Sequence, residues 1–526
     1  MIAIYQVLPR LFGNRTANNV QGGQLSECGS GKFSDFSTAV LDHIREMGFT
    51  HVWYTGVIRH ATQTDYTAHG IPRQSPDVVK GVAGSPYAIA DYYDVDPDLA
   101  TDIAGRMGEW EALIERTHRA GLKVVMDFVP NHVAREYRSV CLPEGTKDLS
   151  DENFYLLDGE VRIGNYAEKP ARATGNNVFS CQPSTGDWYE TVKLNYDHHD
   201  TWDKMTAILL FWSQKGVDAF RCDMAEMVPS SFWRYATAAV RKAFPDIDFI
   251  GEVYNPFLYR EYIASGFTYL YDKVGMYDCL RDVVCKRRPA SDITCQWQAT
   301  DDIRQHMLYF LENHDEQRIA SDFFAGDGRK GVPAAIISVL MQTNPFMLYM
   351  GQEYGERGMD AEGFSGKDGR TTIFDYWTVG SLLRGLYDRS QLSEEERSLE
   401  QTYSLLLNIA QKEPAAREGT FFDLMYVNLD SQTFDASRQY AFLRKSGNEM
   451  LLVVANFSDS EVRCGINIPQ HAFDYLGIAQ PHGDTPIEVE ATDLLSQEKT
   501  VLRLSPIQPV EAVVPAHGGR VYKVVL

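Results

Sequence analysis

Eight short apolar segments, separated by helical patterns, constrain the fold of this 526-residue chain more than any other feature of its sequence. Most are rich in β-branched or aromatic residues and apolar at successive positions, as strands are when both faces of a parallel sheet are covered. The expected strands are Ile2–Val7, His51–Tyr54, Lys123–Phe128, Val217–Arg221, Phe249–Gly251, Tyr269–Tyr271, Met307–Leu311 and Phe346–Tyr349. Eight β/α units in a row predict a closed (β/α)8 TIM barrel of the α/β class rather than an open sheet.

Helical periodicity separates several of these strands. Apolar residues recur at spacings of three and four, which places them on one face of a helix. The clearest sets are Phe36, Val40, Ile44 and Met47, then Met107, Trp110, Ile114 and Thr117, then Met205, Ile208, Leu209 and Trp212.

Two departures from the repeat predict additional domains. After the third strand, residues 133–195 are polar and rich in Gly and Asn, too long for an ordinary connection, which predicts a small inserted domain. From residue 419 to 526, alternating apolar segments and turn signals predict a C-terminal antiparallel β-sandwich, with strands near 440–443, 450–456, 461–466 and 520–525. The barrel itself is expected over residues 1–132 and 196–418.

The charge balance narrows the classes of partner. The chain has 50 basic and 72 acidic residues, a net charge of -22, which would repel nucleic acids and anionic membrane surfaces. No uncharged apolar stretch is long enough to span a membrane, and no secretory signal precedes the first strand, so we expect a cytoplasmic protein. The eight cysteines form no CxxC pair, which argues against a disulfide framework or a zinc site.

Three carboxylates follow predicted barrel strands. Asp223 ends the fourth strand segment, Glu252 ends the fifth, and Asp315 follows the seventh. Residues at the carboxyl ends of barrel strands meet at one rim, where the active sites of such barrels are built. Paired carboxylates at short separation are the groups that glycoside bond cleavage requires. By strand alternation Arg221 shares a face with Asp223, where it can keep that carboxylate ionised, whereas Cys222 should point away.

Four motifs carry a resemblance to a known family. They are Asp127-Phe-Val-Pro-Asn131-His132, Gly216-Val-Asp-Ala-Phe-Arg221-Cys-Asp223, Gly251-Glu252 and Phe310-Leu-Glu-Asn313-His314-Asp315. In this order, each on the expected strand, they resemble the signature regions of the α-amylase superfamily of glycoside hydrolases (family 13 type). Leu194-Asn195-Tyr196 is similar to a fifth, shorter family motif.

The resemblance implies a retaining mechanism and assigns roles. Asp223 would be the nucleophile, Glu252 the general acid and then base, and Asp315 the carboxylate that holds the hydroxyls of the distorted sugar. His132, His314 and Arg221 would bind or position the sugar in the cleavage subsite, and Tyr87 would be its stacking platform. Asp91 and Asp127 would be architectural. Further platforms are expected among Trp188, Tyr189, Tyr254, Tyr354 and Trp377.

Some positions depart from the family pattern. Many α-amylases have Lys-His three and four residues after the nucleophile, where this chain has Glu226 and Met227. That His helps to bind a structural calcium, so a calcium is supported here at one ligand position only, Asn131, and no cofactor or catalytic metal is expected. Ala88 stands where the exo-acting α-glucosidase branch has Asp.

The sequence therefore predicts a hydrolase that cleaves α-1,4 bonds in malto-oligosaccharides or α-glucans through a covalent glycosyl-enzyme intermediate. Alternatives with the same site are a transglycosylase or isomerase, a sucrose- or trehalose-type enzyme, and a phosphorylase variant. A non-catalytic sugar-binding homologue is disfavoured, because Asp223, Glu252 and Asp315 are all present. Chain-length preference, α-1,4 versus α-1,6 preference, endo versus exo action and oligomeric state stay open.

Overall fold

A computed structural model describes residues 1–155, 161–163, 166–168, 188–361, 363–479 and 485–526. Eight parallel strands close into a barrel in the order β1-β14-β13-β12-β11-β10-β5-β2. This confirms the predicted barrel, and every predicted strand lies within two residues of an observed one. The barrel strands are β1 (Ala3–Val7), β2 (His51–Tyr54), β5 (Lys123–Phe128), β10 (Ala219–Cys222), β11 (Asp248–Gly251), β12 (Tyr269–Tyr271), β13 (Met307–Phe310) and β14 (Phe346–Tyr349).

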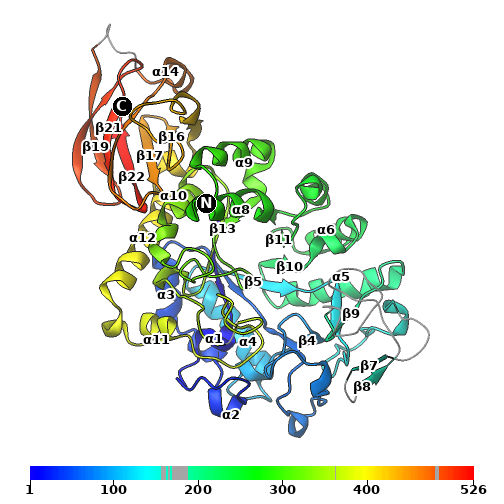
Figure 1. Ribbon diagram of the computed structural model, residues 1–526. Coiled ribbons are helices and arrows are strands. Elements are labelled where there is room, and N and C mark those ends of the chain that lie inside the picture. Colours follow the sequence, from blue (N-terminus) through cyan, green and yellow to red (C-terminus); the bar gives the residue numbers. More distant parts are fainter. Residues whose placement is uncertain (156–160, 164–165, 169–187, 362, 480–484) are drawn as a thin grey trace.

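The helices cover the outside of the barrel, and the three predicted helical faces are buried against it except for the half-buried Met107 (Figure 1). The α-helices of six or more residues are α3 (Thr38–Glu46), α4 (Arg106–Arg119), α5 (His199–Gln214), α6 (Ser230–Ala243), α7 (Tyr259–Ala264), α8 (Asp278–Val284), α9 (Ile293–Ala299), α10 (Val332–Leu340), α11 (Gly380–Leu386), α12 (Glu394–Lys412) and α14 (Gln470–Leu476).

The barrel interior is a packed core. Side chains of alternate strand residues fill it, including Ile4, Trp53, Val125, Ala219 and Ile250. The intervening residues pack outward against the helices. Because both faces of each strand are therefore covered, the strands are apolar at nearly every position, which is the pattern that predicted them.

Small antiparallel sheets interrupt the repeat near the carboxyl ends of the strands. Between β5 and β10, β6 (His132–Ala134) pairs with β9 (Thr191–Lys193), and β7 (Val161–Ile163) pairs with β8 (Tyr166–Glu168). Half of the remainder of the predicted inserted domain lies outside the described residues. A further pair, β3 (Ile58–His60) and β4 (Ile89–Val95), was not predicted. The limits 1–132, 133–195, 196–418 and 419–526 remain our proposal for the domain boundaries.

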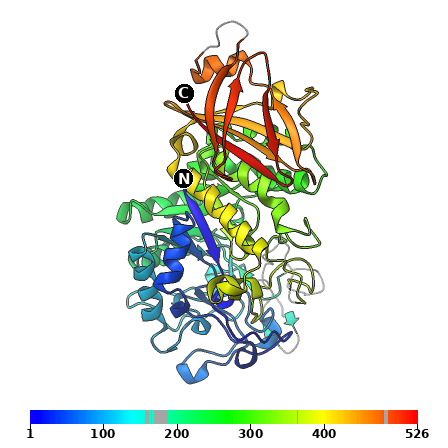
Figure 2. The same cartoon turned by 90° about the vertical axis from the view of Figure 1, so that its left-hand side faces the viewer.

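The C-terminal domain is mainly β and antiparallel, as predicted, with one short helix, α14. Its larger sheet has the order β15-β16-β17-β22-β19-β20, and β18 pairs with β21 in a second sheet. The domain lies at one end of the barrel, where α10 packs on its larger sheet (Figures 1 and 2). The strands are β15 (Thr420–Asp423), β16 (Gln439–Ser446), β17 (Glu449–Asn456), β18 (Val462–Ile466), β19 (Ile487–Asp493), β20 (Lys499–Leu504), β21 (Val510–Val514) and β22 (Gly518–Val525).

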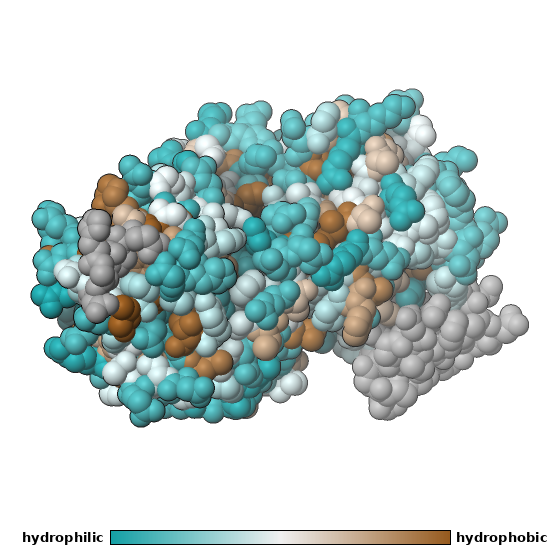
Figure 3. Space-filling model, turned by 90° about the horizontal axis from the view of Figure 1, so that it is seen from above, coloured by the Kyte–Doolittle hydropathy of each residue, from teal (hydrophilic) through white to brown (hydrophobic). Residues whose placement is uncertain are grey.

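The surface is consistent with the acidic composition. In the view of Figure 3 it is mainly hydrophilic, with small and separate hydrophobic patches. Among the described residues, no helix combines the length and the apolar character needed to cross a membrane.

Candidate active site

Arg221 is the centre of the candidate site. Ala219 faces the barrel interior, so alternation along β10 directs Arg221 and then Asp223 to the same side. The Arg221 guanidinium is fully buried and lies beside the rings of Trp53, Tyr87 and Tyr271, with centroids 5.2, 5.4 and 5.5 Å from its central carbon. Its charge survives burial because carboxylates surround it on the rim side.

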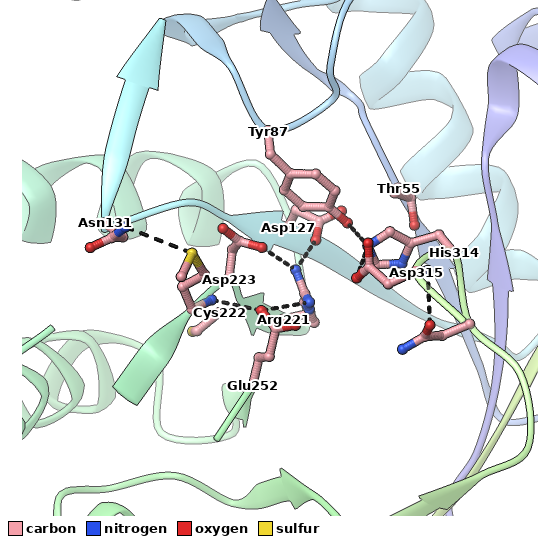
Figure 4. Close-up of polar contacts among 12 residues, drawn as sticks. Thr55, Tyr87, Asp127, Asn131, Arg221, Cys222, Asp223, Glu252, His314 and Asp315 are labelled. Carbon is pink, nitrogen blue, oxygen red and sulfur yellow. Dashed lines mark hydrogen bonds and ion pairs between the residues drawn. The ribbon is translucent and has the colours of Figure 1, made fainter. Parts of the chain in front are cut away.

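One guanidinium binds both proposed catalytic carboxylates. Arg221 Nη1 lies 2.8 Å from Asp223 Oδ1, and Nη2 lies 3.0 Å from Glu252 Oε2 (Figure 4). Asp127 Oδ1 is 3.5 Å from Nη1, and Trp53 donates a 2.9 Å hydrogen bond to the other oxygen of Asp127. Asp127 therefore has the architectural role expected from the sequence, and the residues named in the fourth and fifth strand motifs meet at one point.

Glu252 is held by two donors besides Arg221. The backbone N–H of Met224 donates to Glu252 Oε2 at 2.7 Å, and Tyr254 Oη donates to Oε1 at 2.9 Å. Met224 follows Asp223 and adopts a left-handed backbone conformation, with φ 44°. This conformation is unfavourable for a residue with a side chain, and strain of this kind is typical of functional sites. Because Met224 directly follows Asp223, its N–H links the backbone at one proposed catalytic carboxylate to the side chain of the other.

Asp315 belongs to a second polar group on the opposite side of Arg221. Gln6 Nε2 lies 2.7 Å from His314 Nδ1, so this nitrogen accepts and the proton resides on Nε2. His314 Nε2 lies 3.0 Å from Asp315 Oδ2 and 2.7 Å from Tyr87 Oη, and the Tyr87 and His314 rings stack at 5.2 Å. The imidazole thereby fixes both the carboxylate and the tyrosine (Figure 4).

The two aspartates have opposite pKa shifts. Burial raises the pKa of Asp223 well above its ordinary value; Arg221 opposes this rise, and Glu252, Asp127 and Asp315 add to it. Burial also raises the pKa of Asp315, but His314, Arg221 and Arg370 outweigh it, and the net shift is downward. A cluster with more carboxyl groups than cations retains a proton to higher pH than an isolated carboxyl group does. That behaviour suits acid–base chemistry near neutral pH.

A cavity of about 440 Å³ opens over this cluster. Five of the seven predicted site residues line it, namely Tyr87, His132, Asp223, Glu252 and Asp315. The other two differ from the expectation of direct sugar binding. Arg221 and His314 are 0% and 1% exposed and lie behind the wall, because their polar atoms are directed at the carboxylates and Tyr87. They are placed to position other residues.

The aromatic residues expected at the rim separate into two groups. Trp188 and Tyr254 line the cavity. Tyr189, Tyr354 and Trp377 do not line it. The Tyr354 side chain is buried and its hydroxyl donates a hydrogen bond to Glu400, and the Trp377 indole N–H donates one to Asp360. Three further residues that line the cavity were not predicted. Phe364 and Phe374, on the long loop after β14, have ring centroids 5.0 Å apart, and the Lys80 ammonium lies 4.1 Å from the Phe374 ring centroid. For Phe364 and Phe374, the length of the loop that carries them was the one signal in the sequence.

Glu226, which departs from the family pattern, has a structural role. Its Oε2 accepts hydrogen bonds from the backbone N–H groups of Tyr254 at 3.1 Å and Asn255 at 2.9 Å, and it also lines the cavity. It therefore fixes the loop that carries Tyr254.

Among the described residues, support for a calcium ion stays at the single ligand position Asn131. Its amide nitrogen lies 3.2 Å from His132 Nδ1 and 3.8 Å from Met224 Sδ. Calcium takes six to eight oxygen ligands, and a thioether and an imidazole are poor substitutes. Elsewhere among the described residues, Asp91, Asp94 and Cys141 lie close together, but Arg59 and Arg106 already neutralise the two carboxylates. We derive no step through a metal.

The strained backbone of Met224 leads to a first prediction. Met224→Val should destabilise the protein by about 1–2 kcal/mol, because a β-branched residue fits the left-handed region poorly. It should also lower kcat by displacing the N–H group that holds Glu252. Met224→Gly, the control, keeps that N–H in an allowed conformation and should retain most activity. Urea unfolding and kcat measure both effects; equal behaviour of the two variants would contradict the strain argument.

His132 leads to a prediction about pH. Burial lowers the pKa of His132 to about 3, whereas an unfolded histidine titrates near 6.5. Between these values the unfolded chain binds the extra proton, so the free energy of unfolding should fall as pH decreases, by up to about 1.4 kcal/mol per pH unit for this residue. Burial also lowers the pKa of His60 to about 3, so His60 should likewise reduce the free energy of unfolding as the pH decreases.

The test is urea unfolding at several pH values from about 7 to about 4. The His132→Gln variant should lose less stability across this range than the unmodified protein. His199→Gln, at an exposed position on α5, is the control and should leave the slope unchanged. An unchanged slope in His132→Gln would contradict the buried neutral state.

Comparisons with known proteins relate two parts of the chain to one family of enzymes. The family model for the α-amylase catalytic domain matches residues 6–262, and the model for the α-amylase C-terminal all-beta domain matches residues 430–480. The α-amylase MalA of Haloarcula japonica is 23% identical over 478 residues, which cover 89% of this chain and 60% of the relative. A cyclomaltodextrinase of a Bacillus species is 21% identical over 474 residues, which cover 86% of this chain and 72% of that relative. The chain thus spans about three fifths of the length of the first relative.

Solved structures share the fold over the whole chain. An α-amylase from Geobacillus thermoleovorans, solved in complex with acarbose, superposes with a TM-score of 0.68 at 20% identity, covering 100% of this chain and 98% of that one. The maltogenic α-amylase AmyB from Thermotoga neapolitana gives a TM-score of 0.67 at 20% identity, and the match covers 100% of this chain and 99% of that one. At these identities the superposition establishes the common architecture.

Proposed function

This chain belongs to the α-amylase family of glycoside hydrolases, and we propose that it hydrolyses α-1,4-glucosidic bonds in malto-oligosaccharides or longer α-glucans with retention of configuration. The observation that carries the proposal is the pair of carboxylates on one guanidinium, Asp223 and Glu252, at the wall of one cavity. This shared contact favours the retaining spacing, about 5–5.5 Å between carboxyl groups, over the wider inverting spacing.

Asp223 is the proposed nucleophile. Its carboxylate attacks the anomeric carbon, the bond from that carbon to the leaving oxygen breaks, and a glycosyl ester forms on Asp223. Burial raises the pKa of Asp223, and the 2.8 Å contact with Arg221 opposes this rise and favours the ionised carboxylate that attack requires. His132 Nε2 lies 3.9 Å from the other Asp223 oxygen and is neutral, so it can donate a hydrogen bond to the sugar without neutralising the nucleophile.

Glu252 is the proposed acid and base. In the first step its proton passes to the leaving oxygen; in the second it accepts a proton from the water that attacks the anomeric carbon and releases Asp223. Two inversions at that carbon give net retention. Met224 N–H and Tyr254 Oη fix the orientation of the carboxyl group through both steps.

Asp315 is proposed to bind the sugar hydroxyls of the distorted transition state. Its lowered pKa keeps it ionised, and its side chain is 35% exposed toward the cavity, unlike the buried Asp127. Tyr87 lies beside it at the cavity wall, where its ring packs on His314 and near Arg221, and it is proposed to contact the sugar ring.

Product analysis with four substrates tests the proposal. Maltoheptaose should be cleaved to shorter malto-oligosaccharides, with rates unaffected by added phosphate. Pullulan should be cleaved more slowly, and sucrose and trehalose should be left intact. Predominant transfer products, isomerised disaccharides or a requirement for phosphate would instead identify one of the alternative activities.

A further inference from the structure

The short turn that follows the proposed nucleophile reaches both oxygens of Glu252, by two routes. The first route is direct, because the backbone N–H of Met224 donates to Glu252 Oε2 at 2.7 Å. The second route passes through Glu226, whose side chain accepts hydrogen bonds from the backbone N–H groups of Tyr254 and Asn255. The Tyr254 hydroxyl in turn donates to Glu252 Oε1 at 2.9 Å. One turn of the chain thus sets the position of the whole carboxyl group.

The turn that carries Glu226 is itself anchored to the barrel. The Tyr262 hydroxyl lies 3.1 Å from the backbone oxygen of Glu226 and 2.9 Å from that of Val228. The Trp233 indole N–H donates to the backbone oxygen of Ala225 at 3.0 Å. The half-buried Glu226 carboxylate accepts from its two N–H partners at 3.1 and 2.9 Å, and charged acceptors form the stronger hydrogen bonds. The loop that carries Tyr254 is therefore fixed to a rigid support.

The partners of the two Glu252 oxygens differ in one chemical property. Oε2 contacts the N–H of Met224 and, at 3.0 Å, Nη2 of Arg221, and neither group can accept a proton (Figure 4). Oε1 contacts the hydroxyl of Tyr254, which can accept as well as donate. A protonated Glu252 therefore carries its proton on Oε1. Burial and the nearby Glu252 raise the pKa of Tyr254 well above its ordinary value, so its hydroxyl stays neutral throughout.

We propose that Tyr254 and Glu226 are positioning residues for the acid–base steps, a role that rests on the proposed function of Glu252. Before substrate binds, the Tyr254 hydroxyl accepts a hydrogen bond from protonated Glu252. When the proton passes from Oε1 to the leaving oxygen, the hydroxyl donates to the carboxylate that remains, and this bond is stronger in the transition state than in the ground state. In the second step the bond reverses, as Oε1 takes a proton from water. Glu226 keeps the hydroxyl within reach through the backbone of its loop.

The Tyr254→Phe variant tests the hydroxyl with two substrates, phenyl α-maltoside and 4-nitrophenyl α-maltoside. Both place an aryl ring on the leaving-group side, but 4-nitrophenolate needs less protonation to depart. The kcat/KM of the variant should fall about tenfold or more on the phenyl substrate, as expected for loss of a hydrogen bond to a charged group. On the nitrophenyl substrate it should stay within about threefold.

The ratio of the two rates separates positioning from other roles of Tyr254. Misfolding of a fraction of the variant, or loss of a sugar contact, would lower both rates by the same factor, and that result would overturn the proposal. The control is Tyr235→Phe, which removes an exposed tyrosine–aspartate hydrogen bond on α6 and should change neither rate.

Variants of Glu226 test whether it acts through Tyr254. Glu226→Gln keeps an oxygen that can accept from both backbone N–H groups, so it should retain most activity on the phenyl substrate. Glu226→Ala should show the same dependence on the leaving group as Tyr254→Phe. The double variant Glu226→Ala/Tyr254→Phe should lose no more than about twofold beyond Tyr254→Phe alone, because the two residues serve one contact. Losses that multiply, or a Gln variant as impaired as the Ala variant, would overturn the role of Glu226.

The proposed function and the positioning role fail in different ways. If the unmodified protein leaves maltoheptaose intact but cleaves the aryl maltosides, the proposed substrate is wrong, and the two leaving groups still decide the role of Tyr254. If maltoheptaose is cleaved, but Tyr254→Phe loses the same factor on both aryl maltosides, the positioning role is wrong and the proposed function stands.

Discussion

The Asp223→Asn variant should lose essentially all turnover of maltoheptaose, with kcat reduced on the order of 10⁴-fold or more. An amide of the same shape cannot form the glycosyl ester, because it carries no anionic oxygen to attack the anomeric carbon. A substrate with a good leaving group, such as a nitrophenyl or fluoride glycoside, should not restore the rate, since the missing group is the nucleophile. Binding of maltoheptaose should change by less than about tenfold, because the cavity shape is kept.

The matched control for this variant is Asp203→Asn, at an exposed carboxylate on α5. It removes the same charge from the surface and should leave kcat unchanged. An Asp223→Asn enzyme that retains more than about a tenth of the activity would remove Asp223 from the nucleophile role.

The Glu252→Gln variant should lose about 10²–10⁴-fold in kcat on maltoheptaose, the usual contribution of a positioned acid or base. Here a good leaving group should restore the first step, because the departing group no longer needs a proton. The ester on Asp223 should then accumulate, since no base activates water, and a burst of leaving group should precede slow turnover. This response to the leaving group distinguishes an acid from a nucleophile.

Glu115→Gln, a carboxylate with 74% side-chain exposure on α4, is the control. Unchanged activity of Glu252→Gln would refute the assignment of the acid. Loss of sugar binding along with turnover would instead indicate that the carboxyl group supports the cavity wall.

The barrel could be predicted from the sequence because its strands are buried on both faces. Segments such as Lys123–Phe128 are short and apolar at nearly every position, which is typical of a strand in a parallel sheet that helices cover. The strand pair β3–β4 was missed, because Ile58–His60 is only three residues long and polar in composition. Within the C-terminal domain, β19 was not predicted although its residues alternate in exposure; it pairs with β20 and β22.

The candidate site was predictable only where residues belong to strands. Strand ends bring Asp223, Glu252 and Asp315 to one rim, so their positions follow from the barrel. The depth of a side chain does not follow, which is why Arg221 and His314 were expected in contact with the sugar but lie behind the wall. Aromatic residues on loops were the least predictable, because Tyr354 and Trp377 resemble platform residues in sequence, yet their polar atoms donate hydrogen bonds to Glu400 and Asp360.

The retaining mechanism depends on a covalent bond from the sugar to residue 223, and trapping that bond tests it most directly. Incubation of Glu252→Gln with 5-fluoro-α-D-glucosyl fluoride, followed by intact-mass measurement and peptide mapping, should give one added glucosyl group, located on the peptide containing Asp223. No adduct, while hydrolysis of maltoheptaose releases the β-anomer first, would indicate direct attack by water. An adduct on another carboxylate would show that a different residue is the nucleophile.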